Sequence, residues 1–347
     1  MLRNSTLRRA ALPALLLISA LIVASCGPAA PGGPGPAERP PTTRPPTSAP
    51  PVGAGVSAIN VPGGFGAQKG FWQVFFTAPT GSSDESTYTA GIDTQLAAAI
   101  DGATGTIDVA AYELNNERIT EALLDAHARG VTVRVVTDDE AGVEDEEATI
   151  SQLSAAGIPV VDDDRSALMH NKFVIIDSTV VWTGSWNFTI NGTYRNNNNA
   201  IALRSSRAVA SFQTEFDEMF TDGEFGPRSS ADTPNPSFTQ DGTPIRVVFA
   251  PEDEVTAVLA EVIGGATSSI RFMAFSFTLD DLRDLIIQRA AAGVEVEGIF
   301  DRLGSRRDFS EMIPFVCAGL SMREDGNPFI LHHKVFIIDD DTVLTGS

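Results

Sequence analysis

The stretch "HNKFVIIDSTVVWTGSWN", from His170 to Asn187, has a near copy in "HHKVFIIDDDTVLTGS", from His332 to Ser347. In each copy a Lys follows the His by two residues, an Asp follows the Lys by five, and a Gly-Ser pair begins seven residues after the Asp. A sequence motif that recurs within one chain indicates an internal repeat, and the repeat decides the fold class.

The repeat extends well upstream of the two motifs. Thr106–Asp139 matches Ser269–Arg302 at an offset of 163 residues, and Phe75–Pro79 matches Val247–Pro251. Between the copies lies Thr221–Pro244, a stretch rich in Gly, Pro, Ser and Asp that is typical of a linker. The globular part of the chain is therefore predicted to form two similar lobes.

Each copy alternates short apolar strands with a helix. Apolar residues recur at helical spacing at Ile119, Ala122, Leu123 and Ala126, and again at Leu282, Leu285 and Ile286. Gly130 and Gly293 follow these helices, where a left-handed C-cap suits glycine. The pattern predicts an α/β fold in which each lobe is a mixed β-sheet flanked by helices.

The motif itself predicts a β-hairpin in each lobe. Side chains two residues apart share one face of a strand, so His170 and Lys172 point the same way, as do His332 and Lys334. The two Asp residues have the opposite parity, near the hairpin turn, and are expected to brace the turn or neighbouring backbone groups: Asp177 and Asp339.

An imidazole beside an ammonium group suits a phosphate ester. Lys supplies a compact positive charge with three donors for phosphoryl oxygens. A neutral His attacks phosphorus, while a second, protonated His gives a proton to the leaving oxygen. Two such faces in one chain are able to meet as a pseudo-dimer, so we expect one active site at the lobe interface. Of the three Lys in the chain, two are in the motifs, and this argues against chance.

The doubled motif resembles the signature of the phospholipase D superfamily, HxKxxxxD followed by Gly-Ser and usually an Asn. The first copy matches through Asn187, the second matches as far as Ser347, and the resemblance covers residues 56–347. It implies a two-lobed phosphodiesterase that works through a phosphohistidine, with no obligatory metal or organic cofactor. The superfamily includes phospholipases, phosphatidyltransferases and nucleases, so the motif does not name the substrate.

The resemblance also implies roles for individual residues. His170 would be the nucleophile and His332 the general acid and base. The implied catalytic set is His170, Lys172, Asp177, His332, Lys334 and Asp339, and the implied substrate-binding set is Ser185, Asn187 and Ser347.

Two features depart from the superfamily pattern. Asn198 stands where simple nuclease-like members often have an acidic residue, and an Asn orients an imidazole without lending it charge. The second copy also has no equivalent of the strand and helix expected after Ser185, so we expect the second lobe to be truncated at its C-terminal end.

The first 26 residues resemble a bacterial lipoprotein signal peptide. A basic start is followed by an apolar stretch and by Val23-Ala24-Ser25-Cys26, which is similar to a lipobox. Residues 27–55 are Pro-rich and read as an extended linker. We expect an extracytoplasmic lipoprotein that a lipid on Cys26 anchors to the bacterial cell membrane, with a secreted protein as the alternative. The expected division of the chain is a signal at 1–26, a linker at 27–55, lobe 1 at 56–222, an inter-lobe linker at 223–245 and lobe 2 at 246–347.

The formal net charge of the chain is −21, which disfavours general binding to nucleic acid because such binding rests on Lys and Arg. We expect a monomeric phosphodiesterase that acts on a phospholipid or a related diester. The alternatives are an extracytoplasmic endonuclease of the same superfamily and a phosphatidyltransferase. A surface binding protein with an inactive site is disfavoured by the intact His and Lys in both copies.

Overall fold

The computed structural model describes residues 55–347. The predicted signal peptide, Cys26 and all of the predicted linker except Gly55 lie outside the described residues. Within the described part of the chain, no helix is both long enough and apolar enough to span a bilayer. The two lobes described below belong to one compact unit of the chain.

The first lobe is built on a nine-stranded sheet in the order β1-β2-β3-β9-β8-β7-β4-β5-β6. The strands are β1 (Ser57–Ile59), β2 (Gly64–Lys69), β3 (Trp72–Thr77), β4 (Thr106–Ala111), β5 (Thr132–Thr137), β6 (Val160–Asp162), β7 (Lys172–Ile176), β8 (Val180–Gly184) and β9 (Asn199–Leu203). Strands β4, β5 and β6 run parallel to one another, whereas β4 pairs with β7 in the antiparallel sense.

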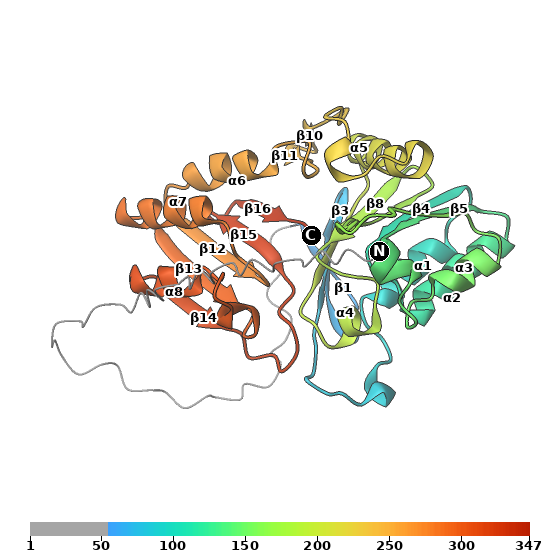
Figure 1. Ribbon diagram of the computed structural model, residues 1–347, viewed down its shortest axis with the longest axis horizontal. Coiled ribbons are helices and arrows are strands. Elements are labelled where there is room, and N and C mark those ends of the chain that lie inside the picture. The colour runs from blue at the N-terminus through green and yellow to red at the C-terminus, as the bar shows by residue number, and fades with distance from the viewer. Residues whose placement is uncertain (1–54) are drawn as a thin grey trace, which may run out of the picture. The chain divides into compact units, whose positions relative to one another are not determined.

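Helices cover both faces of this sheet (Figure 1). They are α1 (Asp93–Asp101), α2 (Glu117–Ala128), α3 (Ile150–Ala155), the short α4 (Ile190–Tyr194) and α5 (Ser206–Asp217). Because alternate residues of a strand face opposite sides, Val174 packs in the core under α1 to α3, and Phe173 and Ile175 pack with α5. The motif strand β7 is therefore buried on both faces, which fixes its register firmly.

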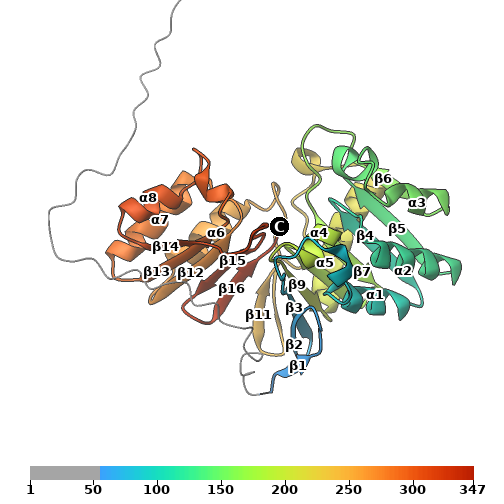
Figure 2. The ribbon, with the colours of Figure 1, turned by 90° about the horizontal axis from the view of Figure 1, so that it is seen from below.

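The second lobe is built on a five-stranded sheet in the order β14-β13-β12-β15-β16. Its strands are β12 (Ser269–Ala274), β13 (Glu295–Phe300), β14 (Ser321–Glu324), β15 (Lys334–Ile338) and β16 (Thr342–Thr345), and its helices are α6 (Val255–Gly264), α7 (Asp280–Ala291) and α8 (Met312–Cys317). Figure 2 shows these three helices on the same side of the sheet. Four Phe rings form the centre of the core there: Phe272, Phe277, Phe300 and Phe315.

The two sheets confirm the internal repeat. The order β14-β13-β12-β15-β16 matches β6-β5-β4-β7-β8 of the first lobe strand for strand, with the same parallel and antiparallel pairs. The predicted α/β class and the two similar lobes are therefore present. As expected, Gly130 and Gly293 adopt left-handed φ values of 91° and 99° after the matching helices α2 and α7.

The segment between the lobes contains regular structure. A two-stranded hairpin is formed by β10 (Ser237–Gln240) and β11 (Thr243–Arg246), within and just beyond the segment predicted to be a linker. Single helical turns complete the described chain at Glu85–Thr87, Asp139–Val143, Glu218–Asp222, Gly226–Arg228 and Gly304–Arg306.

Candidate active site

The sheets bring both motifs to equivalent edges. Lys172 at the start of β7 pairs with Ala111, the last residue of β4, and Lys334 at the start of β15 pairs with Ala274, the last residue of β12. Each His-Lys pair thus lies at the carboxyl edge of the parallel strands of its own lobe.

Backbone hydrogen bonds join the two edges. The Asn197 N–H donates to Ile330 O at 2.9 Å, and the His332 N–H donates to Asn197 O at 2.9 Å. Asn197 and Leu331 form a parallel β-bridge at this point. We call the contact between residues 197–199 and residues 330–333 the lobe seam. It carries the second motif's histidine against the first lobe.

Two oxygens of the first lobe hold the His332 ring. Its Nδ1 lies 2.9 Å from Ser185 O and 3.0 Å from Asn198 Oδ1. The Asn198 amide is oriented unambiguously, because its Nδ2 donates to Gly192 O at 2.9 Å. Both partners of Nδ1 are therefore acceptors, so Nδ1 carries the proton and Nε2 of the neutral ring keeps its lone pair. Asn198 thus orients the ring, as the sequence suggested.

The Ser185 hydroxyl is used within the protein. It is completely buried, contacts the Asn198 and Asn199 side-chain oxygens at 2.9 and 3.0 Å, and accepts from the Asn199 N–H at 3.1 Å. These bonds tie β8 to residues 198 and 199, so in this structure Ser185 positions the seam. The Ser347 hydroxyl of the second motif is exposed and donates to His170 O at 3.0 Å.

The motif lysines are arranged alike in both lobes. Lys172 Nζ donates to His170 O at 2.9 Å, and Lys334 Nζ donates to His332 O at 3.1 Å. Each ammonium therefore folds back beside its own histidine. Lys172 is 2% exposed, and a lysine this deeply buried requires an anionic partner to hold its charge.

Sequence reasoning missed an aromatic residue that supports each motif. Tyr112 follows β4, and its ring lies 4.8 Å from the His170 ring and 4.9 Å from Lys172 Nζ. Phe275 follows β12, and its ring lies 5.2 Å from the His332 ring and 5.3 Å from Lys334 Nζ. These two positions are related by the repeat offset, so the signal was an aromatic residue at the same place in both copies.

The electrostatics of the protein groups favour neutral imidazoles. Burial, together with Lys172 and Lys334, lowers the pKa of His170 to about 3, and the same groups lower the pKa of His332 to about 3. Burial also lowers the pKa of Lys334 to about 8, and burial and Lys334 lower the pKa of Lys172. The lysine of the other lobe therefore contributes to the pKa of each histidine. The hydrogen bond from the Ser347 hydroxyl to His170 O joins the two motifs directly.

A carboxylate that the motif does not contain belongs to the site. Glu113 follows Tyr112 and accepts a 2.7 Å hydrogen bond from Asn187 Nδ2. Burial raises the pKa of Glu113, and the nearby Lys172 and the bond from Asn187 oppose this rise. The Asn187 Oδ1 is buried and has no hydrogen-bond partner in the described structure. The second copy has Ser276 at the position of Glu113, so the repeat gave no signal for this residue.

The two motif aspartates have structural contacts. Asp177 accepts from the N–H groups of Thr104, Gly105 and Thr106 at 2.7 to 3.2 Å. In the second lobe Asp339 accepts from the N–H groups of residues 267–269 at 2.7 to 3.1 Å. Burial alone would raise the pKa of Asp177, but the hydrogen bonds outweigh burial and lower it. The corresponding hydrogen bonds lower the pKa of Asp339. Both side chains brace the turn before the first parallel strand, at the edge opposite the histidines.

Known proteins resemble this chain over the two lobes. A family of domains described as "Cardiolipin synthase, PLD-like domain" matches residues 96–220 and 259–347. The mitochondrial cardiolipin hydrolase of Chlamydomonas reinhardtii is 35% identical over 118 residues, which are 34% of this chain and 52% of that protein. A phospholipase D of Rickettsia bellii (strain RML369-C) is 36% identical over 117 residues, which are 34% of this chain and 58% of that protein. The chain thus spans little more than half the length of these relatives.

Solved structures agree on the fold. The phosphatidylserine synthase of Haemophilus influenzae matches 72% of this chain and 74% of its own, with a TM-score of 0.52 at 14% sequence identity. At that identity the likeness concerns the fold alone. It extends over a larger part of this chain than the match to either curated relative.

Proposed function

We propose that this chain, which belongs to the family of cardiolipin synthase and phospholipase D-like domains, hydrolyses a phosphodiester, most simply that of a phospholipid. The meeting of two His-Lys faces at the lobe seam carries the proposal. There His332 of one lobe is bonded to Ser185 O and Asn198 Oδ1 of the other. Two histidines and two lysines around one position are the groups that a double displacement at phosphorus requires.

In the proposed reaction His170 is the nucleophile. Its Nε2 forms a bond to phosphorus, and the bond from phosphorus to the alkoxide oxygen breaks. His332 gives the leaving oxygen a proton from its Nε2. It then takes a proton from water as the water oxygen forms a bond to phosphorus and the bond from phosphorus to His170 Nε2 breaks. The products are an alcohol and a phosphomonoester, and both histidines return to their starting states.

The charges of the site suit this sequence. Lys172 and Lys334 neutralise the phosphoryl oxygens, which stabilises the charge that develops in the transition state. A bound phosphate is an anion, so it raises the pKa of both lysines and of His332. His332 is then able to carry the proton that it donates. His170 is the more exposed of the two rings, which suits the residue that meets the substrate first.

Alanine substitution of each histidine tests the mechanism. His170→Ala and His332→Ala should each lower turnover of bis(p-nitrophenyl) phosphate by about a thousandfold or more, because neither role is supplied elsewhere. The same proteins are assayed on phosphatidylcholine, cardiolipin and single-stranded DNA to rank substrates. In the His332→Ala protein a labelled diester should leave phosphate on His170. Label on any other residue would exclude this assignment, and a preference for DNA would favour the nuclease alternative.

We also propose that the protein is an extracytoplasmic lipoprotein anchored through Cys26. The lipobox-like stretch that ends at Cys26 and the Pro-rich linker at residues 27–55 support this proposal. Cys26→Ser should move the protein from the membrane fraction to the soluble fraction while turnover of a soluble diester stays the same. Retention of the variant on membranes, after a wash with high salt, would argue against a lipid at this position.

A further inference from the structure

Large apolar side chains protrude from one end of the second lobe. The set, which we call the apolar rim, consists of Leu279, Leu303, Phe309, Ile313 and Val316. The most exposed are Phe309 at 61% and Ile313 at 62%. Isolated exposed apolar residues are ordinary on a protein surface, whereas five of them on two loops and the adjoining helix α8 indicate a partner.

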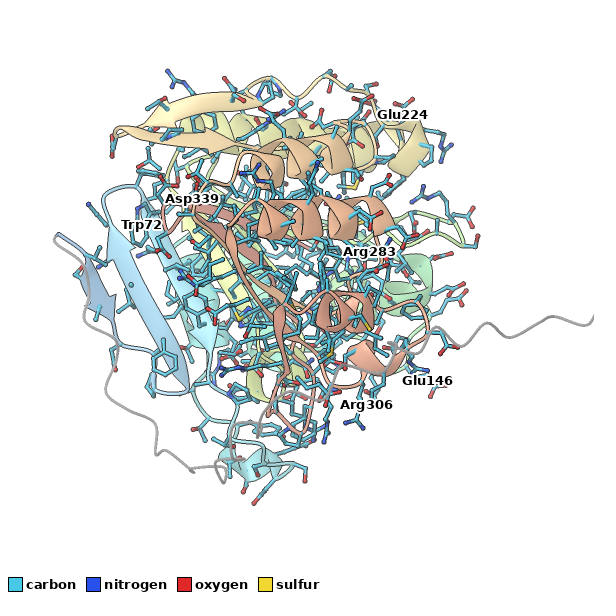
Figure 3. All side chains as sticks on the ribbon, turned by 90° about the vertical axis from the view of Figure 1, so that its left-hand side faces the viewer. Trp72, Glu146, Glu224, Arg283, Arg306 and Asp339 are labelled. Atoms are coloured by element: carbon cyan, nitrogen blue, oxygen red, sulfur yellow. The ribbon has the colours of Figure 1, made fainter. Side chains whose placement is uncertain are left out.

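The apolar rim lies at the same edge of the sheet as the second motif. Leu279 ends the loop after β12, Leu303 and Phe309 follow β13, and the other two members lie in α8, which comes next. His332 and Lys334 stand at this same carboxyl edge, where the Phe275 N–H donates to His333 O at 3.1 Å. Figure 3 shows Arg306 of the β13 loop and Asp339 at opposite ends of the lobe.

Three arginines accompany the rim in a chain whose formal net charge is −21. Arg302, Arg306 and Arg307 lie in the loop that carries Leu303 and Phe309, and the exposed carboxylate of that segment is Asp308. Two further acids there are buried: Asp301, and Glu311, which pairs with Arg283. Arg306 pairs with Glu324 at 3.0 Å, and within residues 55–347 neither of the other two arginines forms an ion pair. The equivalent loop of the first lobe is the acidic run at residues 138–147, which an anionic surface repels.

Exposed apolar side chains beside arginines suit the interface of a phospholipid bilayer. Leu and Phe side chains enter the boundary between headgroups and acyl chains, and guanidinium groups bond lipid phosphates. The side chains of the rim come from three segments, the loop after β12, the loop after β13 and α8. Exposed apolar side chains on separate segments are able to enter a lipid surface one by one, with no matched packing.

We propose that the apolar rim docks the second lobe on a phospholipid bilayer, with Arg302 and Arg307 at the level of the lipid phosphates. The inference rests on the proposed phospholipid substrate, since docking at this edge presents the headgroup to the site while the acyl chains stay in the bilayer. The lipid proposed at Cys26 keeps the protein near the membrane, and the rim turns the active site toward it.

The test uses the full chain with Cys26→Ser, so that no lipid anchor contributes. Sedimentation with vesicles of phosphatidylcholine, with and without phosphatidylglycerol, measures partitioning. Adding Phe309→Ser and Ile313→Ser should weaken partitioning by about tenfold or more, because two protruding side chains no longer enter the interface. The matched control is Val343→Ser. It removes a side chain that is also 62% exposed, but that lies outside the rim, in β16 opposite Ile337 of β15.

Two readouts separate docking from chemistry. The Phe309→Ser and Ile313→Ser protein should turn over bis(p-nitrophenyl) phosphate like its parent, while its KM for vesicle phospholipid rises. Equal vesicle binding by this protein and its parent would overturn the proposal. Failure of the parent to bind either vesicle would also overturn it, and would leave a protein partner or a second copy as the occupant. Loss of soluble-diester turnover in the parent would count against the proposed function alone, because partitioning does not require it.

Discussion

At the scale of single residues, two neighbouring amides hold the two neighbouring histidines of the second lobe. Asn198 Oδ1 lies 3.0 Å from His332 Nδ1, and Asn199 Oδ1 lies 3.1 Å from His333 Nδ1. An amide oxygen fixes the tautomer and direction of an imidazole but gives little stabilisation to its protonated form. The proton affinity of His332 is therefore set by burial, by Lys334 and Lys172, and by the bound substrate.

Asn198→Asp tests this view of His332. A carboxylate beside Nδ1 stabilises the imidazolium, so the pKa of His332 should rise, and the histidine should stay protonated to a higher pH. A reaction step in which neutral His332 accepts a proton then needs a higher pH. The acidic limb of the profile of kcat against pH should therefore move upward by about 1 pH unit.

The control for this prediction adds a charge at the adjacent position. Asn199→Asp introduces a carboxylate in the same seam, but it faces His333 and not His332. Its pH profile should resemble that of the unmodified protein. If both variants shift the acidic limb equally, the effect comes from the general field of the seam, and the direct contact with Asn198 does not set the behaviour of His332.

Glu113 influences the charge of Lys172. It helps to keep Lys172 charged, and it holds Asn187 through a hydrogen bond. Glu113→Gln retains an acceptor for Asn187 and removes the charge, so the pKa of Lys172 should fall. Activity that needs the charged lysine should then be lost at a lower pH, with the basic limb of kcat/KM moved down by about 0.5–1 pH unit. Glu117→Gln, on the exposed start of α2, is the control and should leave the limb in place.

At the scale of secondary structure, the sequence predicted the elements that the repeat contains. The strand, helix and strand units, the motif hairpins and the glycine caps follow from apolar spacing and from residues that tolerate positive φ. In the hairpin turns Asp177 and Ser178 have φ values of 51° and 50°, and Asp339 and Asp340 have values of 54° and 60°. Asp tolerates this region, so a polar pair between two apolar strands was a sufficient signal.

Elements without a counterpart in the other copy were harder to predict. The strands β1 to β3 extend the first sheet through the pairing of β3 with β9, a contact between residues far apart in sequence. The hairpin of β10 and β11 lies in a Pro- and Gly-rich segment whose composition is typical of a linker. Local sequence patterns predict neither the pairing of β3 with β9 nor the hairpin of β10 and β11, because the contacts that stabilise them come from other parts of the chain.

The candidate site shows the same division. The motif predicted the two histidines and two lysines, and strand parity predicted the bracing role of both aspartates. The motif did not predict Glu113, which lies in the loop after β4 and contacts Asn187 only once the sheet has folded. Nor did it show that the Ser185 hydroxyl is buried between Asn198 and Asn199, since that depends on how β8 and β9 pair.

At the scale of the whole molecule, the lobes meet over buried histidines that are neutral. Burial, with Lys334 second, lowers the pKa of His333 to about 4, and burial and the lysines lower that of His332 to about 3. Both values lie below the ordinary histidine value of 6.5. The unfolded chain therefore binds more protons than the folded chain from about pH 6.5 down to about pH 4 for His333 and pH 3 for His332. Stability from this source is complete above pH 6.5 and declines as the pH falls through that window.

His333 allows the pH response of the seam to be measured without touching the proposed chemistry. It is 6% exposed, its Nδ1 bonds Asn199 Oδ1, and its ring lies edge-on to Phe76 of β3. His333→Asn keeps a donor but cannot take up a proton in this pH range. Between pH 7 and pH 5 the melting temperature of the variant should therefore fall less than that of the unmodified protein, by several degrees for a difference of about 1–2 kcal/mol. His127→Asn, which removes a histidine of α2 outside the seam, should keep the unmodified response. An equal fall in all three proteins would mean that acid loosens the molecule elsewhere and that the seam is not where its protons are taken up.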